Sequence, residues 1–213
     1  MLNKIRYKLY RLLTLISLRV RYQRKPFDFY KFSKNLSIPI INSLDLGSGP
    51  SPRNPFNASS VYGVDIRSWD KNKNIKKCIL GKENIPFKEN YFDVVTAFDV
   101  LEHIPRISND LDRVTFPFIT AMNEVWRVLK VNGLFYSQTP CFPMREAFQD
   151  PTHVNIMTED TLKLYFADKN WARIYGYVGT FELVSEVWCG SHYCCVLKKT
   201  HDKPILDLNY QQS

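Results

Sequence analysis

Short apolar runs that alternate with helix-like segments constrain the fold of this chain more than any other feature. The first two runs, Ile41–Leu46 and Val61–Ile66, are rich in strand-forming residues, and each closes on an aspartate and a turn. Strands are also predicted at Cys78–Leu80, Phe92–Phe98, Leu134–Gln138, Phe181–Trp188 and His192–Lys198, and helices at Asp110–Lys130 and Thr158–Phe166. Because most of these strands are too apolar to be half exposed, the pattern predicts an open α/β sheet that is mostly parallel, with an antiparallel C-terminal strand.

The length and composition fit one domain with a hydrophobic core. Of the 213 residues, 45% are hydrophobic, 14% aromatic and 23% charged, which excludes a disordered chain, a collagen-like repeat and a small disulfide scaffold. The mean hydropathy of -0.28 argues against a multi-span membrane protein, since a spanning helix needs about 20 apolar residues. We expect a basic helix and linker at 1–35, a domain at 36–200 and a C-terminal tail at 201–213.

The positive charge of the chain is concentrated at its N-terminus. Lysines and arginines number 29 against 21 aspartates and glutamates, which gives a net charge of +8. Eight of the basic residues and no acidic residue fall within residues 1–25, so the remaining chain is balanced. A nucleic-acid-binding domain would spread its basic residues over one face of the domain itself, so this distribution does not predict one. The eight are Lys4, Arg6, Lys8, Arg11, Arg19, Arg21, Arg24 and Lys25.

Residues 1–22 are predicted to form an amphipathic helix. Apolar residues recur there at intervals of three and four, at Leu2, Ile5, Leu9, Leu12, Ile16 and Val20. A signal peptide is not expected, because Arg19-Val20-Arg21 follows the apolar run without a small-residue cleavage site. Two interpretations stay open. Either the apolar stripe packs on the domain, or residues 1–25 make a peripheral contact with an anionic membrane surface.

The cysteines predict free thiols. There are five, an odd number, and they include no Cys-x-x-Cys pair and no zinc-ligand spacing. They are Cys78, Cys141, Cys189, Cys194 and Cys195. This usage indicates a reducing compartment, so we expect a cytoplasmic protein, and we expect no metal site.

A glycine-containing loop follows the first predicted strand. In Leu44-Asp45-Leu46-Gly47-Ser48-Gly49-Pro50, the two glycines permit a tight turn and a close approach of backbone N–H groups to a ligand. Asp65, twenty residues after Asp45, ends the second strand, where a carboxylate can accept two hydrogen bonds from a ribose diol. The loop and the acid together predict an adenosine-containing ligand. The alternative is a turn followed by a helix-capping aspartate.

Two further motifs point to one family. Residues 85–104 read IPFKENYFDVVTAFDVLEHI, and residues 123–134 read NEVWRVLKVNGL. With the glycine loop and Asp65, they resemble in order and spacing the motifs of class I S-adenosylmethionine-dependent methyltransferases of the type-11 branch. The resemblance covers residues 41–140 and implies a Rossmann-like fold, methyltransferase activity and S-adenosylmethionine as cofactor.

The resemblance also implies roles for single residues. The loop after the first strand would hold the methionine end of the cofactor through Asp45, Leu46, Gly47, Ser48 and Gly49. Asp65 would bind the ribose hydroxyls, and Ile66 would pack on the adenine. Phe98 and Asp99 would lie beside the sulfonium and the amino-acid portion. Asp93 also matches a family position, or else it serves the turn of its own strand.

The chain departs from the family pattern in four ways. Ser51 replaces the third glycine of the loop, and Pro52 and Pro55 predict that the usual first helix is short or lost. The segment after the second strand is too polar and brief for the usual second helix, so one sheet face needs another cover, for which the N-terminal helix is a candidate. Gly81-Lys82 stands where the family often has an acid for the adenine amino group, which leaves that contact to backbone groups or Asn84.

Two histidines are candidates for the acceptor side of the site. His103 follows the fourth strand, and His153 lies in the loop Gln149–Val154 after the fifth. Methyl transfer is an in-line displacement, and a hydroxyl acceptor benefits from a base that takes its proton. We therefore predict catalytic roles for His103 and His153, with a structural role as the alternative for each. The loop of His153 resembles segments of methyltransferases associated with surface-glycan and lipid-linked sugar assembly, so the acceptor is predicted to be a hydroxyl of a small molecule, a sugar or a lipid-linked glycan intermediate.

Aromatic residues of the acceptor half either stack on a sugar or belong to the core. They are Tyr165, Trp171, Tyr175, Tyr177 and Trp188. A nucleic-acid acceptor is not expected, because Phe98-Asp99-Val100-Leu101 replaces the Asn/Asp-Pro-Pro-aromatic motif of base methyltransferases. Cys141 follows a proline but lacks the pattern that supports a cysteine nucleophile, and we expect a buried thiol. The remaining alternative is a non-catalytic cofactor-binding partner of another enzyme.

Overall fold

A computed structural model describes residues 2–21, 26–34, 36, 39–69, 72–110 and 113–204. The predicted tail lies mostly outside these residues. All five cysteines are within them, and all five are free thiols.

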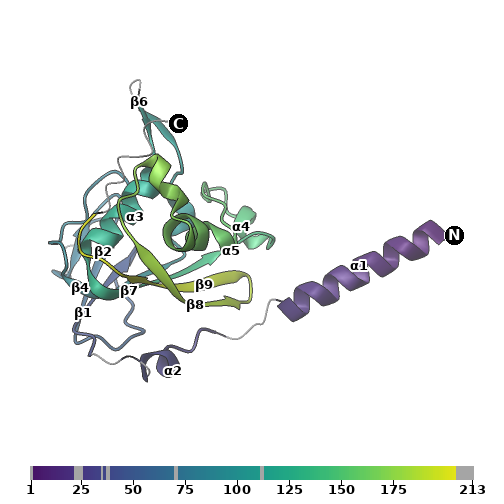
Figure 1. The fold of residues 1–213 in the computed structure, drawn as a ribbon, viewed down its shortest axis with the longest axis horizontal. Helices are drawn as coiled ribbons and strands as arrows, with labels where there is room; N and C mark the ends of the chain where they lie inside the picture. The colour runs from purple at the N-terminus through teal and green to yellow at the C-terminus, as the bar shows by residue number, and fades with distance from the viewer. Residues whose placement is uncertain are drawn as a thin grey trace.

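A seven-stranded sheet with the strand order β3-β2-β1-β4-β7-β9-β8 forms the centre of the molecule (Figure 1). Strands β1 to β4 and β7 pair in parallel, whereas β9 runs antiparallel to both β7 and β8. The predicted fold, a mostly parallel open sheet with an antiparallel C-terminal strand, is confirmed. The strands are β1 (Asn42–Leu46), β2 (Ser60–Asp65), β3 (Ile75–Lys77), β4 (Phe92–Phe98), β7 (Leu129–Pro140), β8 (Phe181–Cys189) and β9 (His192–Lys199).

Helices and a small hairpin complete the fold. One face of the sheet carries α3 and the helical segments that precede β8, as Figure 1 shows. The elements are η1 (Leu101–His103), β5 (Ser108–Asp110), β6 (Arg113–Thr115), α3 (Pro117–Val128), α4 (Glu146–Gln149), α5 (Glu159–Leu162), the π-helical η2 (Lys163–Asp168) and η3 (Trp171–Tyr175). Met122, Val125 and Trp126 of α3 are buried against the sheet, as their helical spacing predicts.

Two predicted elements have different limits in the structure. The helix predicted at Asp110–Lys130 begins only at Pro117, because the β5–β6 hairpin precedes it and proline is favoured at the first helical position. The strand predicted at Cys78–Leu80 lies earlier, at Ile75–Lys77. The N–H groups of Lys82 and Glu83 both donate to the carbonyl of Ile79, and this turn takes the chain out of the sheet.

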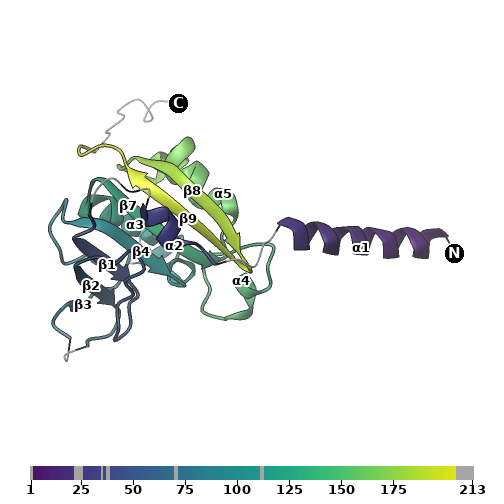
Figure 2. The same ribbon diagram turned by 90° about the horizontal axis from the view of Figure 1, so that it is seen from below.

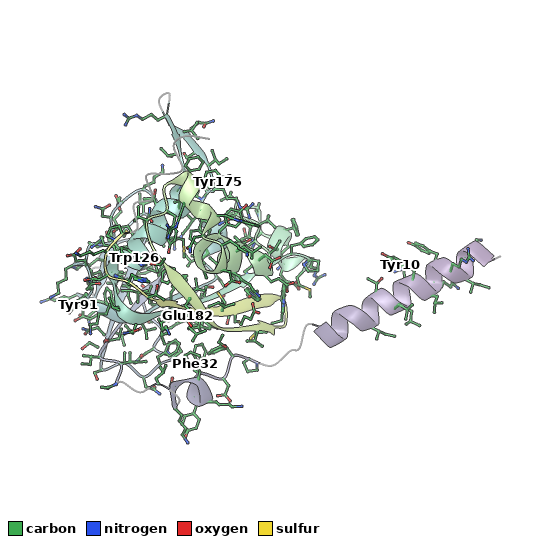
Figure 3. All side chains as sticks on the ribbon, in the orientation of Figure 1. Tyr10, Phe32, Tyr91, Trp126, Tyr175 and Glu182 are labelled. Atoms are coloured by element: carbon green, nitrogen blue, oxygen red, sulfur yellow. The ribbon has the colours of Figure 1, made fainter. Side chains whose placement is uncertain are left out.

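The expected loss of the first two helices of the pattern is confirmed where the structure describes the chain. Residues 47–59, between β1 and β2, are all described, and none is helical; nor is any described residue between β2 and β3. The opposite sheet face is instead covered by the segment that contains α2 (Phe29–Lys34). Phe27, Phe29 and Phe32 pack there against Phe56 and Tyr136, with ring centroids 4.8 to 6.3 Å apart. Figures 2 and 3 show α2 beside the sheet and Phe32 on the side of α2 that faces it.

Helix α1 (Leu2–Arg21) does not cover the sheet. Ile5, Leu9, Leu12 and Ile16 are between 50% and 59% exposed, and Figures 1 and 2 both show the helix extending away from the domain. The interpretation in which its apolar stripe packs on the domain is therefore wrong, because the phenylalanines of residues 27–32 already occupy that face. Part of the expected linker thus belongs to the core, although the proposed limits of the domain stay a prediction.

Candidate active site

Several predicted site residues meet at one edge of the sheet. Parallel strands present their carboxyl ends together, and there β1, β2 and β4 end at Leu46, Asp65 and Phe98. Strand β7 ends beside them at Pro140, and the antiparallel pairing places His192, at the start of β9, opposite Pro140.

Asp45 is buried beneath the loop that follows β1. It is 2% exposed, and its carboxylate accepts hydrogen bonds from the Arg53 backbone N–H (2.8 Å) and the Thr96 hydroxyl (2.8 Å). Burial raises the pKa of Asp45, and the two donated hydrogen bonds oppose this rise by stabilising the ionised form. Asp45 therefore fixes the path of the loop from below. The side chain of Leu46 is also buried, so only the backbone of these two residues can face a ligand.

The loop itself needs its glycines. Gly47 has a φ of +64°, and a Cβ there would lie 2.7 Å from Cγ2 of Val100. Gly63 of β2 permits close packing, because a Cβ on it would lie 2.3 Å from the hydroxyl oxygen of Ser48. At Gly49, with a φ of +58°, a Cβ would meet no atom within 4 Å. The backbone at Gly49 thus borders open space, which a ligand can approach.

Asp65 and Ile66 border the same space from β2. The Asp65 carboxylate accepts the backbone N–H of Gly49 (2.9 Å) and that of Arg67 (2.9 Å), which orients it toward the loop. Each carboxylate oxygen has a second lone pair that can accept a ribose hydroxyl. Ile66 is 61% exposed, an apolar side chain next to the acid. A half-buried carboxylate, an exposed apolar side chain and an open glycine backbone fit a nucleoside with its diol and its base.

Phe98 and Asp99 continue the site after β4. The guanidinium of Arg53 lies 4.6 Å from the centroid of the Phe98 ring, whose other neighbours include Phe29 and Tyr136. Asp99 has a φ of +53°, and its carboxylate lies 3.0 Å from Nε2 of His192. The hydrogen bond to Asp99 raises the pKa of His192 against the opposing effect of partial burial.

Asp93 lies away from this edge. Its carboxylate accepts the backbone N–H groups of Ile41 (3.0 Å) and Asn42 (2.8 Å) and pairs with the ammonium of Lys130 (2.6 Å). These contacts join the beginnings of β1 and β4. Of the two predicted roles for Asp93, the structural one fits its position.

His103 and His153 lie next to each other, as a shared role requires. Their ring centroids are 4.9 Å apart. Nδ1 of His153 is 3.2 Å from the Ala147 carbonyl, and Nδ1 of His103 is 3.2 Å from the Thr152 carbonyl. His153 is nearly buried, with 9% of its side chain exposed, whereas His103 is exposed.

Glu102 lies beside the two histidines, and the sequence analysis assigned it no role. It is 1% exposed, its Oε2 accepts the hydroxyl of Thr139 (2.8 Å), and burial raises its pKa. Its Oε1 lies 3.9 Å from Nε2 of His153. A charged residue between an apolar strand end and a histidine could have signalled this position. His192 was also missed, although the predicted C-terminal hairpin places it at the same edge.

A cavity of about 390 Å³ lies between α3 and the segments α5, η2 and η3. Of the predicted aromatic residues, Tyr165 and Tyr175 line it, whereas Tyr177 and Trp188 are core residues, 2% and 8% exposed. Trp171, 49% exposed, packs on Tyr165. Arg106 lines the cavity too, and its Nε donates to Asn155 (2.6 Å), whose backbone N–H donates to the carbonyl of Glu102 (2.9 Å). These two hydrogen bonds connect the cavity to the cluster of Glu102, His103 and His153, called the histidine cluster below.

Cys141 is a buried thiol, as expected. It is fully buried, and burial raises its pKa to about 12. A thiol with this pKa is protonated near neutral pH and is a poor nucleophile.

Comparisons with solved structures show the same fold. The PH0226 protein from Pyrococcus horikoshii OT3 has a TM-score of 0.54 at 18% identity, over 80% of this chain and 86% of that chain. A SAM-dependent methyltransferase from Aquifex aeolicus has a TM-score of 0.51 at 19% identity, over 81% and 89%. The [4+2]-cyclase SpnF has a TM-score of 0.50 at 13% identity, over 85% and 87%. At these identities the likeness shows the fold alone, and comparison with the curated proteins gave no match.

A match to a family model shows the family of the chain as well as its fold. The model of the methyltransferase domain matches residues 21–174, well over half of the chain. This match includes the glycine loop, Asp65 and the histidine cluster. The chain therefore belongs to the methyltransferase domain family, as a class I enzyme with a Rossmann-like sheet whose methyl donor is S-adenosylmethionine.

Proposed function

We propose that this enzyme O-methylates a hydroxyl group of a sugar or of a lipid-linked glycan intermediate, at the cytoplasmic face of a membrane. The observation that carries the proposal is the position of His103 and His153. Two imidazoles lie together after β4, and Arg106 and Asn155 connect them, by way of Glu102, to a cavity lined by Tyr165 and Tyr175.

The cofactor would be held by residues that already converge at the sheet edge. Asp65 would accept the ribose hydroxyls, Ile66 would cover the adenine, and the backbone from Gly47 to Gly49 would contact the methionine end. Phe98 and Asp99 would border the amino-acid portion. When bound, S-adenosylmethionine supplies an electrophilic methyl group on a sulfonium, and the transfer is an in-line displacement.

The chain's part in the transfer is to hold the acceptor and to take its proton. Carbonyl oxygens only accept hydrogen bonds, so the contacts of both histidines with carbonyls place a proton on each Nδ1. Each neutral imidazole then keeps a lone pair on Nε2 for the acceptor hydroxyl. Tyr165 and Tyr175 would stack on the sugar, since flat sugar faces pack well on aromatic rings. Arg106, at the same cavity, would donate to its hydroxyls.

A labelled-methyl assay tests the acceptor class. The enzyme is incubated with S-adenosylmethionine carrying a labelled methyl group and a panel of oligosaccharides, each paired with a deoxy analogue. We expect label in the sugar, absent from the matching deoxy analogue and stable to mild alkali, because a methyl ether resists the base that cleaves a methyl ester. Label that alkali releases, or label that enters a nucleic acid instead, would contradict the proposal.

Variants test the histidines in the same assay. His153→Ala is expected to lower turnover strongly, by roughly 100-fold for the loss of acid–base catalysis. His201→Ala is the matched control, since His201 is exposed and contacts its neighbour Thr200. Unchanged turnover of His153→Ala would remove the role assigned to His153.

The membrane part of the proposal rests on α1. Its described side chains carry basic Lys4, Arg6, Lys8 and Arg11 beside exposed apolar residues, a composition that suits the interface of an anionic bilayer. Among the described residues, no helix combines the length and apolar character needed to cross a bilayer. Binding would therefore be peripheral, and it would bring the domain close to a lipid-linked acceptor.

A further inference from the structure

We propose that Glu102, His103 and His153 form a binding site for one divalent transition-metal ion, with Zn²⁺ as its probe. Each residue offers one ligand atom, and the three atoms lie within 4.8 Å of one another. One carboxylate oxygen and two imidazole nitrogens are a common set of three protein ligands for zinc. We had expected no metal site from the cysteine spacing, which carries no information about this cluster.

The first argument is a buried oxygen without a partner. Oε1 of Glu102 is buried and has no hydrogen-bond partner among the described residues, whereas Oε2 is satisfied by Thr139. A buried polar atom left unpaired destabilises the folded state, and a charged one does so more. Such an atom in a folded protein calls for an explanation, and an ion that is absent from a structure is one of the ordinary ones.

The second argument is the orientation of the histidines. The hydroxyl of Thr152 donates to Asp150 (2.7 Å), so its oxygen is left to accept from Nδ1 of His103 (3.1 Å). Nδ1 of His153 donates to the Ala147 carbonyl. These contacts are the arrangement that metal-binding histidines use, in which the second ring nitrogen donates to a carbonyl or hydroxyl and holds the ring in place. Both Nε2 atoms are left with lone pairs.

The third argument is that a hydrogen-bond acceptor of His153 lies next to a hydrogen-bond acceptor of Glu102. Nε2 of His153 and Oε1 of Glu102 lie 3.9 Å apart, too far for a hydrogen bond. Two ligands of a tetrahedral ion at bond lengths of about 2.1 Å are separated by about 3.4 Å. A cation between these two atoms would therefore require only a small adjustment, and the ligand atom of His103 lies within 4.8 Å of both.

An ion at this place would extend the proposed function, and this step rests on the proposed hydroxyl acceptor. Three protein ligands leave at least one coordination position for water or for a substrate oxygen. A hydroxyl bound there would lose its proton more readily, because the cation stabilises the alkoxide. With the ion bound, the proton would pass to water, and the two histidines would hold the ion in place of accepting the proton directly.

Titration of the ion tests the site without any turnover. The full-length protein, free of any affinity tag, is freed of metal with a chelator, the chelator is removed, and Zn²⁺ is titrated in a calorimeter without cofactor or acceptor. We expect one ion per chain. Co²⁺ should also bind and give the visible absorption of a four- or five-coordinate ion with nitrogen and oxygen ligands.

Variants then locate the ion. Glu102→Gln and His103→Ala should each weaken Zn²⁺ binding by at least about tenfold. His201→Ala is the control for exposed imidazoles, and Cys189→Ser is the control for thiols. Both controls should bind Zn²⁺ like the unmodified protein. His103 is exposed, so its variant is informative even if Glu102→Gln does not fold, which circular dichroism would reveal.

The proposal is overturned if the unmodified protein binds no stoichiometric ion. It is equally overturned if a control variant loses the ion, or if Glu102→Gln and His103→Ala both keep it. Binding of S-adenosylhomocysteine to the metal-free protein, measured separately, shows whether the cofactor site is intact. The labelled-methyl assay tests the hydroxyl acceptor separately, so failure of the metal site is distinguished from failure of the proposed function.

Discussion

At the scale of single residues, the aspartates that end β1 and β2 have different surroundings. Asp45 is buried, and both of its oxygens are used by the protein, one by Thr96 and one by the Arg53 backbone. Asp65 is half-buried and holds the loop through Gly49 while keeping lone pairs toward open space. Asp45 therefore shapes the loop after β1, and Asp65 is the residue of the two that can contact a ligand directly.

The substitution Asp65→Ala tests this division. It should weaken S-adenosylmethionine binding by about 1.5–3 kcal/mol, the range for hydrogen bonds to a charged group. Calorimetric titration measures the change. Glu182→Gln is the control, because Glu182 is exposed and pairs with Lys198 on the C-terminal strands. Equal affinities of the Asp65→Ala and control variants would show that another residue binds the ribose.

The His192–Asp99 pair gives the site edge a pH dependence. The pKa of His192 is raised above its ordinary value of 6.5, first by the hydrogen bond to Asp99 and further by the charges of Glu102 and Glu146. A raised folded-state pKa contributes stability that is complete below pH 6.5 and is lost as the pH rises through the folded-state pKa. Solvent screens the pair, since both side chains are partly exposed, so the effect is small.

Thermal melts of the unmodified protein and His192→Gln measure this contribution. The difference between their melting temperatures should be largest near about pH 6 and shrink by about pH 8.5. A difference that does not change with pH would mean that the imidazolium is not what stabilises Asp99.

At the scale of elements, α2 covers the sheet where the described residues form neither of the two helices of the family pattern. The segment before β1 supplies Phe27, Phe29 and Phe32 to that sheet face, and Phe29 contacts Phe98, which is predicted to border the cofactor. The cover of the sheet is therefore in contact with the predicted cofactor site.

Neighbouring residues of α2 provide a matched test. Phe29→Ala should lower the free energy of unfolding by about 2 kcal/mol, since a phenylalanine is removed from an apolar cluster. Tyr30→Ala should change it by less than about 0.5 kcal/mol, because Tyr30 is 69% exposed. Chemical denaturation measures both. Equal effects of the two substitutions would contradict the packing of this segment.

Helix α1 is separable from the domain on this account. Tyr10, labelled on α1 in Figure 3, lies far from the domain, and it is 69% exposed. Removal of residues 1–21 should leave the melting temperature and cofactor affinity unchanged but abolish sedimentation with liposomes that contain anionic lipid. Uncharged liposomes should bind neither form. Loss of folding on truncation, or liposome binding by the truncated chain, would contradict the role of α1.

At the scale of the whole molecule, periodicity and turn signals predict most of the sheet. β4 begins and ends at the predicted residues, since the mostly apolar run from Phe92 to Phe98 suits a central strand. The start of α3 was misplaced by several residues, because local propensity does not distinguish a charged helix turn from the β5–β6 hairpin before Pro117.

The sequence predicts the residues proposed to bind the cofactor, but it does not predict all the residues near the proposed acceptor. The loop at Gly47–Gly49 and Asp65 are tied to strand ends, which periodicity locates. Glu102 lies near His153, and His192 lies near Asp99. The partners in each pair are distant in sequence, so only the folded chain shows that they belong to one site. The cover by Phe29 was missed for the same reason, since its partners Phe56 and Tyr136 are remote in sequence.

The most direct test of the central claim is a thermal-shift titration of the full-length protein with S-adenosylmethionine, S-adenosylhomocysteine and NAD. A ligand at about a hundred times its dissociation constant stabilises a protein by about 2.7 kcal/mol. For a chain of this size that raises the melting temperature by roughly 5–10 °C. We expect this shift with both sulfur ligands and none with NAD. No shift with either sulfur ligand would contradict the assignment of the cofactor site.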